Sequence, residues 1–227
     1  LGSNSWQVQA REIRPAELDP DLCRKIRASI LLAGPTVAKT GELLLPPPGG
    51  DVIGRRRVDT HLLALEKLGA TISYDRAFKF QSNGLTGADI LLDETSVTAT
   101  ENAIMAAVLA TGKSTIRNAA SEPHVQELCH LINKMGGQIE NIGSNTLNIE
   151  GVKVLHGTEF EIGPDYLEVI SFVGAAAVTR GEITIKNAGV QYLDMVRLVF
   201  ARLGVEWEVR GNDIYVPSHQ KLRIEPD

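Results

Sequence analysis

Apolar residues follow two different spacings along this chain, and each spacing predicts a different element. Between residues 125 and 135 apolar side chains recur every three or four positions, which predicts an α-helix with one buried face. The residues on this face are Val125, Leu128, Cys129, Ile132 and Met135. Further on, runs 138–141 and 147–150 alternate with period two on either side of Gly143-Ser144-Asn145, which predicts a β-hairpin.

This order of helix, glycine and hairpin occurs three times. Each copy is about 68 residues long, judged by the spacing of the glycines that end the amphipathic helices. These glycines are Gly69, Gly136 and Gly204. A second glycine-containing marker precedes each of them, at 40–43, 111–114 and 180–183. Two sets of markers in three copies favour an internal repeat over three unrelated α/β hairpins.

Each copy also begins with an apolar helix of small residues, as at 102–109 and 170–178. A glycine stops this helix, and a short strand is predicted after it, at 114–117 and 183–186 in the last two copies. The hairpin of the third copy is predicted within 205–216. The expected fold class is therefore α/β, built from repeated α-β-α-β-β units. Because Ala and Gly allow close approach, the first helices of the units are expected to pack together.

Composition and charge narrow the class of protein. Hydrophobic residues make up 43% of the 227 residues and charged residues 22%, which is typical of a globular protein. The net charge of -5 argues against nucleic-acid and membrane partners, and the apolar stretches reach only about half of a bilayer span. Cys23 and Cys129 form no disulfide framework, so buried thiols and a cytoplasmic location are expected. The chain start shows neither a signal peptide nor a methionine, which suggests a fragment.

The first copy differs from the others in the loop between its first strand and second helix. It has an insertion, 46–59, where the other copies have short links at 120–123 and 189–191. A long, glycine-rich, cationic loop on one unit of a repeat is a common place for function, although a solvated turn with an arginine run is the alternative. The loop matches neither a phosphate-binding P-loop nor a dinucleotide-binding fingerprint.

The residue types of this loop indicate anion chemistry. Gly49 and Gly50 would let backbone N–H groups converge on an anion, and Arg55, Arg56 and Arg57 would supply fork-shaped donors for phosphate or carboxylate. Asp51, a carboxyl group among these donors, is a candidate proton donor. Asp59 and His61 could suggest a metal site, but no second ligand pair lies nearby in the sequence. Surface or helix-cap roles are therefore expected for both.

Five segments of the chain carry a family resemblance. They are 27–30, 48–61, 65–70, 96–102 and 118–123, and the second reads Pro-Gly-Gly-Asp-Val-Ile-Gly-x-Arg-x-Val-Asp-x-His. Over nearly the whole chain the sequence resembles the UDP-N-acetylglucosamine enolpyruvyl transferases of the EPSP synthase-like superfamily. The resemblance implies the inside-out α/β barrel fold of that superfamily, with its repeated α-β-α-β-β units.

The resemblance also implies a reaction, the first committed step of peptidoglycan precursor synthesis. The 3-hydroxyl of UDP-N-acetylglucosamine attacks C2 of phosphoenolpyruvate while C3 takes a proton, and phosphate then leaves. These two small molecules are the implied partners, and no metal or organic cofactor is implied. Asp51 stands where the family carries its proton donor, commonly a cysteine and in some members an aspartate. Arginine neighbours favour the ionised carboxylate, so bound phosphoenolpyruvate and diphosphate would have to neutralise them before Asp51 could hold a proton.

The resemblance assigns substrate contacts to further positions. Arg56 would bind the phosphoenolpyruvate anion, and Arg27 would line the same anionic site. Two segments would run along the uridine and diphosphate. They contain Arg56, Arg57, Val58, Asp59 and Thr60, and Glu94, Thr95, Ser96 and Val97. Arg57 stands where the family usually has proline, and Glu94 where it usually has lysine.

The family has six such repeats in two globes, whereas this chain has three. Residues 1–163 are expected to be two units of the loop-bearing catalytic globe, and 164–227 the first unit of the second globe, with the crossover at Ile162-Gly163-Pro164. Closure of all three units into one globe is the alternative. Since the family's site is assembled across both globes, the chain alone is expected to be inactive without the second half of the protein.

Two other functions fit the same scaffold. One is the related enolpyruvyl transfer of the shikimate pathway, against which the Pro-Gly-Gly-Asp loop and Asp59 argue. The other is a non-catalytic homologue that binds nucleotide-sugar or phosphoenolpyruvate as a sensor. The substitutions at Arg57 and Glu94 are the features that suggest it.

Overall fold

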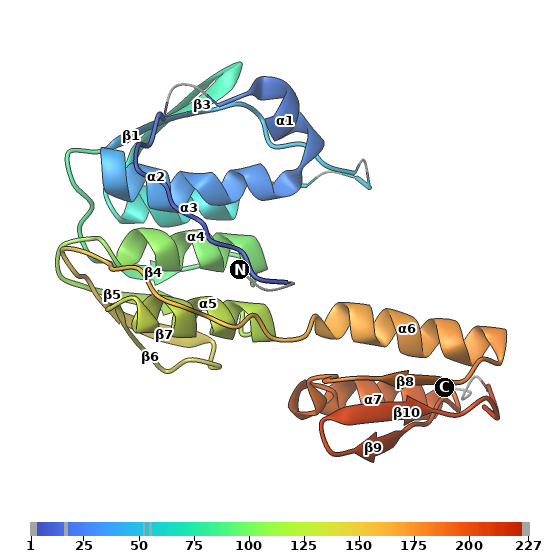
Figure 1. The fold of residues 1–227 in the computed structure, drawn as a ribbon. Helices are drawn as coiled ribbons and strands as arrows, with labels where there is room; N and C mark the ends of the chain where they lie inside the picture. Colours follow the sequence, from blue (N-terminus) through green and yellow to red (C-terminus); the bar gives the residue numbers. More distant parts are fainter. Residues whose placement is uncertain (1–3, 16–17, 52, 55, 224–227) are drawn as a thin grey trace. The chain divides into compact units, whose positions relative to one another are not determined.

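The computed structural model describes residues 4–15, 18–51, 53–54 and 56–223, and the chain divides into two compact units (Figure 1). The first unit is Leu1–Glu159 and the second is Phe160–Asp227. Each has its own hydrophobic core, and the two cores share no residue. In the described part of the chain, no helix combines the length and apolarity that a membrane span requires.

The first unit contains two copies of the repeat. Its elements are α1 (Pro20–Lys25), the 3-10 helix η1 (Arg27–Leu32), α2 (Ala33–Thr40), β1 (Glu42–Leu45), α3 (Asp59–Lys67), β2 (Thr71–Asp75), β3 (Ala77–Gln81), β4 (Asp89–Leu91), α4 (Val97–Ala107), β5 (Lys113–Arg117), α5 (Pro123–Lys134), β6 (Gln138–Glu140) and β7 (Thr146–Glu150). The second unit contains α6 (Tyr166–Thr179), β8 (Ile183–Ile185), the 3-10 helix η2 (Val190–Tyr192), α7 (Asp194–Arg202), β9 (Glu208–Arg210) and β10 (Asp213–Val216).

Strand pairing confirms the predicted repeat. The three sheets have the orders β1-β3-β2, β4-β5-β7-β6 and β8-β10-β9. In every copy the first strand pairs antiparallel with the second strand of the hairpin. The sequence did not predict β4, a three-residue strand that pairs parallel with β5. Three residues are too few to show a period, so β4 forms because β5 offers it an edge.

The glycines that end the second helices have the predicted capping role. Gly69, Gly136 and Gly204 all have left-handed backbones, with φ of 97°, 98° and 73°. A residue with a Cβ is strained in this conformation, which is why a glycine marks the same point of each copy. The earlier glycine-containing marker of the third copy, at 180–183, has a different conformation. There the residue with positive φ, at 56°, is Arg180 and not Gly181.

Matching residues of the last two copies also make matching hydrogen bonds. Asn118 and Asn187 both have positive φ, at 58° and 47°. The alanine after each donates its N–H across to the hairpin turn, from Ala119 to Asn145 O at 2.9 Å and from Ala188 to Asn212 O at 2.8 Å. Similar sequence in the two copies therefore specifies the same turn.

The predicted close packing of first helices occurs between α2 and α4 in the first unit. A Cβ placed on Gly34 of α2 would lie 2.4 Å from the backbone oxygen of Asn102 in α4, so only glycine fits there. The core of the first unit contains the buried side chains of Ile30, Leu43 and Ile104. Cys23 and Cys129 are free and buried, as expected from the lack of a disulfide framework.

Candidate functional site

The inserted loop is fastened to the end of α1 by its two glycines. The N–H of Gly49 donates to Cys23 O at 3.1 Å, and the N–H of Gly50 donates to Arg24 O at 3.2 Å. A Cβ on Gly49 would lie 1.6 Å from Arg24 O. The expectation that these N–H groups converge on an anion is therefore wrong for this structure. They instead satisfy carbonyl groups at a helix end, which have no partner within the helix.

Arg27 holds the other end of the loop. Its Nη2 donates to the carbonyl oxygens of Arg56 at 2.8 Å and Arg57 at 2.7 Å. Burial lowers the pKa of the Arg27 guanidinium, and the positive charge of Arg56 lowers it further. Arg27 and Arg56 therefore lie close enough for their charges to interact.

Asp51 and Arg56 are exposed in the loop. Among the described residues, none makes a hydrogen bond or ion pair with the carboxylate of Asp51 or the guanidinium of Arg56. Arg55, the third member of the expected cationic cluster, and Val52 lie outside the described residues. The structure thus leaves the candidate proton donor and the candidate anion ligand accessible to a substrate.

Arg57 has a different environment from Arg56. Its Nε donates to Oδ2 of Asp59, the first residue of α3. This bond raises the pKa of Arg57 above its usual range, and the negative charges of Asp93 and Glu94 raise it further. The negative charge of Glu94 therefore acts on Arg57, although Asp59 is the main partner of this arginine.

The two segments expected to contact the nucleotide lie side by side. Thr60 Oγ1 donates to Asp93 Oδ1 at 2.7 Å, which joins the first turn of α3 to the residues that precede α4. Ser96 is the N-cap of α4, where its side chain accepts from the N–H of Ala99 at 3.3 Å. Helix N-terminal ends carry partial positive charge and unpaired N–H groups. The arrangement therefore favours a phosphorylated ligand.

Not every expected contact residue turns its side chain outward. Thr60 is only 6% exposed and bonds to Asp93, while Val58 and Val97 pack against the core. Thr95 is exposed, and its Oγ1 donates to Asn118 Oδ1 at 2.8 Å. Of these residues, Thr60, Val58 and Val97 can offer a ligand mainly their backbone.

His61 was expected at the surface or in a helix cap, and this expectation is wrong. The side chain is 3% exposed and contacts Thr98 and Asn102 of α4. Burial, with the charge of Arg27, lowers the pKa of His61 from 6.5 to about 4, so the ring is neutral at pH 7. The sequence did contain a signal, because His61 shares a helical face with the buried Ala64 and Leu65.

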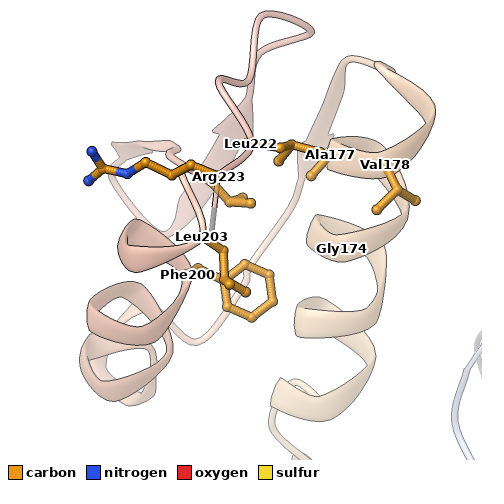
Figure 2. Close-up of a pocket in the computed structure, with 8 residues that line it drawn as sticks. Gly174, Ala177, Val178, Phe200, Leu203, Leu222 and Arg223 are labelled. Atoms are coloured by element: carbon orange, nitrogen blue, oxygen red, sulfur yellow. The ribbon is translucent and has the colours of Figure 1, made fainter. Parts of the chain in front are cut away.

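Among the described residues, no three His, Cys, Asp or Glu side chains gather as metal ligands. The second unit has an open apolar pocket of about 540 Å³ between α6 and α7, which Figure 2 shows. Gly174, Ala177, Phe200 and Leu203 contribute to its lining, and none of the expected site residues does.

Comparisons with known proteins agree with the sequence motifs. A sequence model of the EPSP synthase (3-phosphoshikimate 1-carboxyvinyltransferase) family matches residues 3–226. UDP-N-acetylglucosamine 1-carboxyvinyltransferase of Treponema denticola is 54% identical over 227 residues, which are 100% of this chain and 53% of that protein. The protein of the same name from Bradyrhizobium diazoefficiens is 54% identical over 224 residues, 99% of this chain and 52% of that protein.

Solved structures give the same fold. The enolpyruvyl transferase NikO from Streptomyces tendae has a TM-score of 0.74 at 22% identity, over 90% of this chain and 49% of that one. EPSP synthase from Acinetobacter baumannii has a TM-score of 0.61 at 18% identity, over 87% and 47%. The expected fold class is therefore confirmed. The chain spans about half the length of the curated relatives that it matches.

Proposed function

Because this chain belongs to the EPSP synthase family, we propose that the protein carrying it transfers the enolpyruvyl group of phosphoenolpyruvate to the 3-hydroxyl of UDP-N-acetylglucosamine. The names of relatives at 54% identity support this choice of reaction. The observation that carries it is the hydrogen bond from Thr60, in segment 56–60, to Asp93, the residue next to segment 94–97, while Arg27 bonds to the backbone of Arg56. The product would be a cytoplasmic precursor of peptidoglycan.

Each site residue has a defined part in the proposed reaction. Arg56 and Arg27 hold the phosphoenolpyruvate anion, because guanidinium groups form paired hydrogen bonds with phosphate and carboxylate. Asp51 gives a proton to C3 of phosphoenolpyruvate while the sugar 3-hydroxyl adds to C2 and loses its own proton to a general base in the rest of the protein. Loss of a proton from C3 and of phosphate from C2 then restores the double bond in the product. No metal or organic cofactor takes part.

The uridine and diphosphate lie along Arg57, Val58, Asp59 and Thr60 on one side and Glu94, Thr95, Ser96 and Val97 on the other. Helix N-terminal ends favour the diphosphate, and Arg57 supplies a cation beside Glu94. The proposal includes the domain assignment, with residues 1–163 in the loop-bearing globe and 164–227 in the second globe. The chain alone is then inactive, because the remaining half of the site is supplied by the rest of the protein.

Release of inorganic phosphate tests the proposal. Full-length gene product is incubated with phosphoenolpyruvate alone, with UDP-N-acetylglucosamine, and with 3-phosphoshikimate. Release that requires UDP-N-acetylglucosamine supports the proposed reaction. Release that requires 3-phosphoshikimate instead identifies the shikimate-type transferase, and binding of the sugar nucleotide without release identifies a sensor. Either of the last two results overturns the proposal.

A further inference from the structure

A largely buried polar network connects four elements of the first unit. His61 lies in the first turn of α3, where its Nδ1 is 2.8 Å from Asn102 Nδ2 and its Nε2 is 3.2 Å from Thr98 Oγ1. Asn102 Nδ2 also donates to Ile30 O at 2.9 Å, and Asn102 Oδ1 accepts from the N–H of Gly34 at 2.8 Å. The network thus joins α3 and α4 to η1 and α2.

The bonds of Asn102 fix the direction of the bonds of His61. A backbone N–H can only donate, so the atom of Asn102 that faces Gly34 must be its oxygen. The nitrogen of Asn102 then faces His61 and donates to Nδ1, which carries no proton. In a neutral imidazole the proton is therefore on Nε2, which donates to Thr98 Oγ1. Every polar atom of this ring has one matched partner.

The position of the network gives it a functional meaning. His61 directly follows Asp59 and Thr60, while Thr98 directly follows Ser96 and Val97. We infer that His61 is a positioning residue, which fixes the N-terminal end of α3 against that of α4 and so sets the spacing of the two segments that hold the sugar nucleotide. This inference rests on the proposed function.

The chemistry of the network favours positioning over simple core filling. A leucine would fill the same space without any need for directed partners, and a buried polar group is costly unless each of its atoms is matched. A fully matched network accepts only one relative placement of its helices. Thr60 and Asp93 make a second link between the same two helix ends. A small shift of one helix end would therefore move the proposed ligand-binding residues of that helix and not those of the other helix.

Two substitutions at His61 separate its two bonds. The amide of His61→Asn falls near the place of Nδ1 and keeps the bond to Asn102, whereas the amide of His61→Gln falls near the place of Nε2 and keeps the bond to Thr98. Thr98→Val removes the hydroxyl while keeping the shape. Asn133→Ala in α5 serves as the control, because Asn133 makes two partly buried hydrogen bonds to Ile139 and belongs to no proposed contact.

Steady-state phosphate release by the full-length protein is the measurement. All three variants are expected to raise KM for UDP-N-acetylglucosamine roughly tenfold, the effect of one lost buried hydrogen bond, with kcat and KM for phosphoenolpyruvate changed less than about twofold. Combining His61→Asn with Thr98→Val should cost no more than either change alone, because both remove the same bond. Asn133→Ala should lower the melting temperature and leave both KM values as they are.

Other results overturn the inference in recognisable ways. If the His61 variants change kcat and both KM values together, or behave like Asn133→Ala, His61 only stabilises the fold. If wild-type protein releases no phosphate with UDP-N-acetylglucosamine, the proposed function fails first and the positioning role fails with it. The geometry has its own readout, since proton–nitrogen correlation NMR on the chain should show a protonated Nε2 and a bare Nδ1. The reverse tautomer would contradict the network.

Discussion

Arginines of the proposed site differ in the hydrogen bonds that they already make within the protein. Arg27 donates to two backbone carbonyls, and Arg57 is paired with Asp59. Among the described residues, none pairs with the guanidinium of Arg56, although its charge acts on Arg27. An unoccupied donor beside a second cation is the arrangement that attracts a small dianion, so Arg56 is the residue on which phosphoenolpyruvate affinity should depend most.

We therefore predict that Arg56→Ala weakens phosphoenolpyruvate binding by about ten- to a hundredfold, the usual effect of losing a charge-assisted hydrogen bond. Isothermal titration of full-length protein, saturated with UDP-N-acetylglucosamine, measures the change. Arg210→Ala serves as a control, since Arg210 lies in the second unit and bonds to Glu208. Unchanged affinity in Arg56→Ala would show that the loop does not bind this anion.

Asp51 is predicted to supply the proton for C3. Asp51→Asn should lower kcat by about a hundred- to ten-thousandfold, because an amide cannot act as a general acid. Asp51→Cys should retain turnover and become open to alkylation by the epoxide fosfomycin. Steady-state phosphate release and mass spectrometry of the intact protein are the measurements. Full activity in Asp51→Asn would remove this residue from the mechanism.

His61 is predicted to titrate far below an ordinary histidine. With a folded pKa of about 4 against 6.5 for the free side chain, the unfolded state binds the proton more readily. The contribution of His61 to stability is therefore full above pH 6.5 and is lost as the pH falls toward 4, by about 3 kcal/mol at most. NMR titration of the ring protons of His61 measures this pKa directly. A titration midpoint near pH 6.5 for His61 would contradict the burial of this side chain.

At the scale of elements, the loop depends on its junction with α1. Two successive N–H groups of the loop bond to the last carbonyls of a six-residue helix, and the approach leaves no room for a side chain at Gly49. Short helices have little stability of their own. The helix and the loop should therefore hold each other in place, and a change at Gly49 should disturb both.

We predict that Gly49→Ala detaches the loop from α1, since its Cβ would lie 1.6 Å from Arg24 O. Hydrogen exchange followed by NMR should show faster exchange of the Gly50 amide. Gly157→Ala is the matched control, because a Cβ there would meet nothing within 4 Å. Equal protection of the Gly50 amide in both variants would mean that the contact is not formed in solution.

At the scale of the whole molecule, two separate cores imply two separate unfolding steps. Trp207 is 5% exposed in the core of the second unit, whereas Trp6 is 90% exposed. The ring of Trp207 packs edge-on against that of Phe200, with 6.1 Å between the ring centroids. Changes in tryptophan fluorescence on unfolding should therefore report mainly the second unit. Circular dichroism reports the helices of both units.

We predict that the two signals give different midpoints when this chain is unfolded in urea. Fluorescence should follow one transition, while circular dichroism should follow two. Trp207→Phe provides the control, because it should remove the fluorescence transition and leave the larger part of the circular dichroism change. Coincident curves from both probes would show that the units unfold together.

The sequence by itself determined the repeated α-β-α-β-β unit, the helix-ending glycines and the position of the inserted loop. These features are local, since period, capping and turn residues act over a few neighbouring positions. It also indicated the family through the loop motif, which the comparisons confirm. The assigned substrate contacts remain predictions, although the structure does bring the two segments that contain them together.

Only the tertiary structure decided which polar groups meet. His61 and Asn102 are 41 residues apart, and no local pattern indicates that their bond forms when α3 packs on α4. The sequence predicted that Gly49 helps to direct N–H groups at an anion, because glycine leaves its N–H exposed. In the folded chain the N–H of Gly49 instead donates to a carbonyl group of α1. Buried polar groups must find partners wherever the folded chain places them, so their pairing depends on long-range packing that local spacing does not encode.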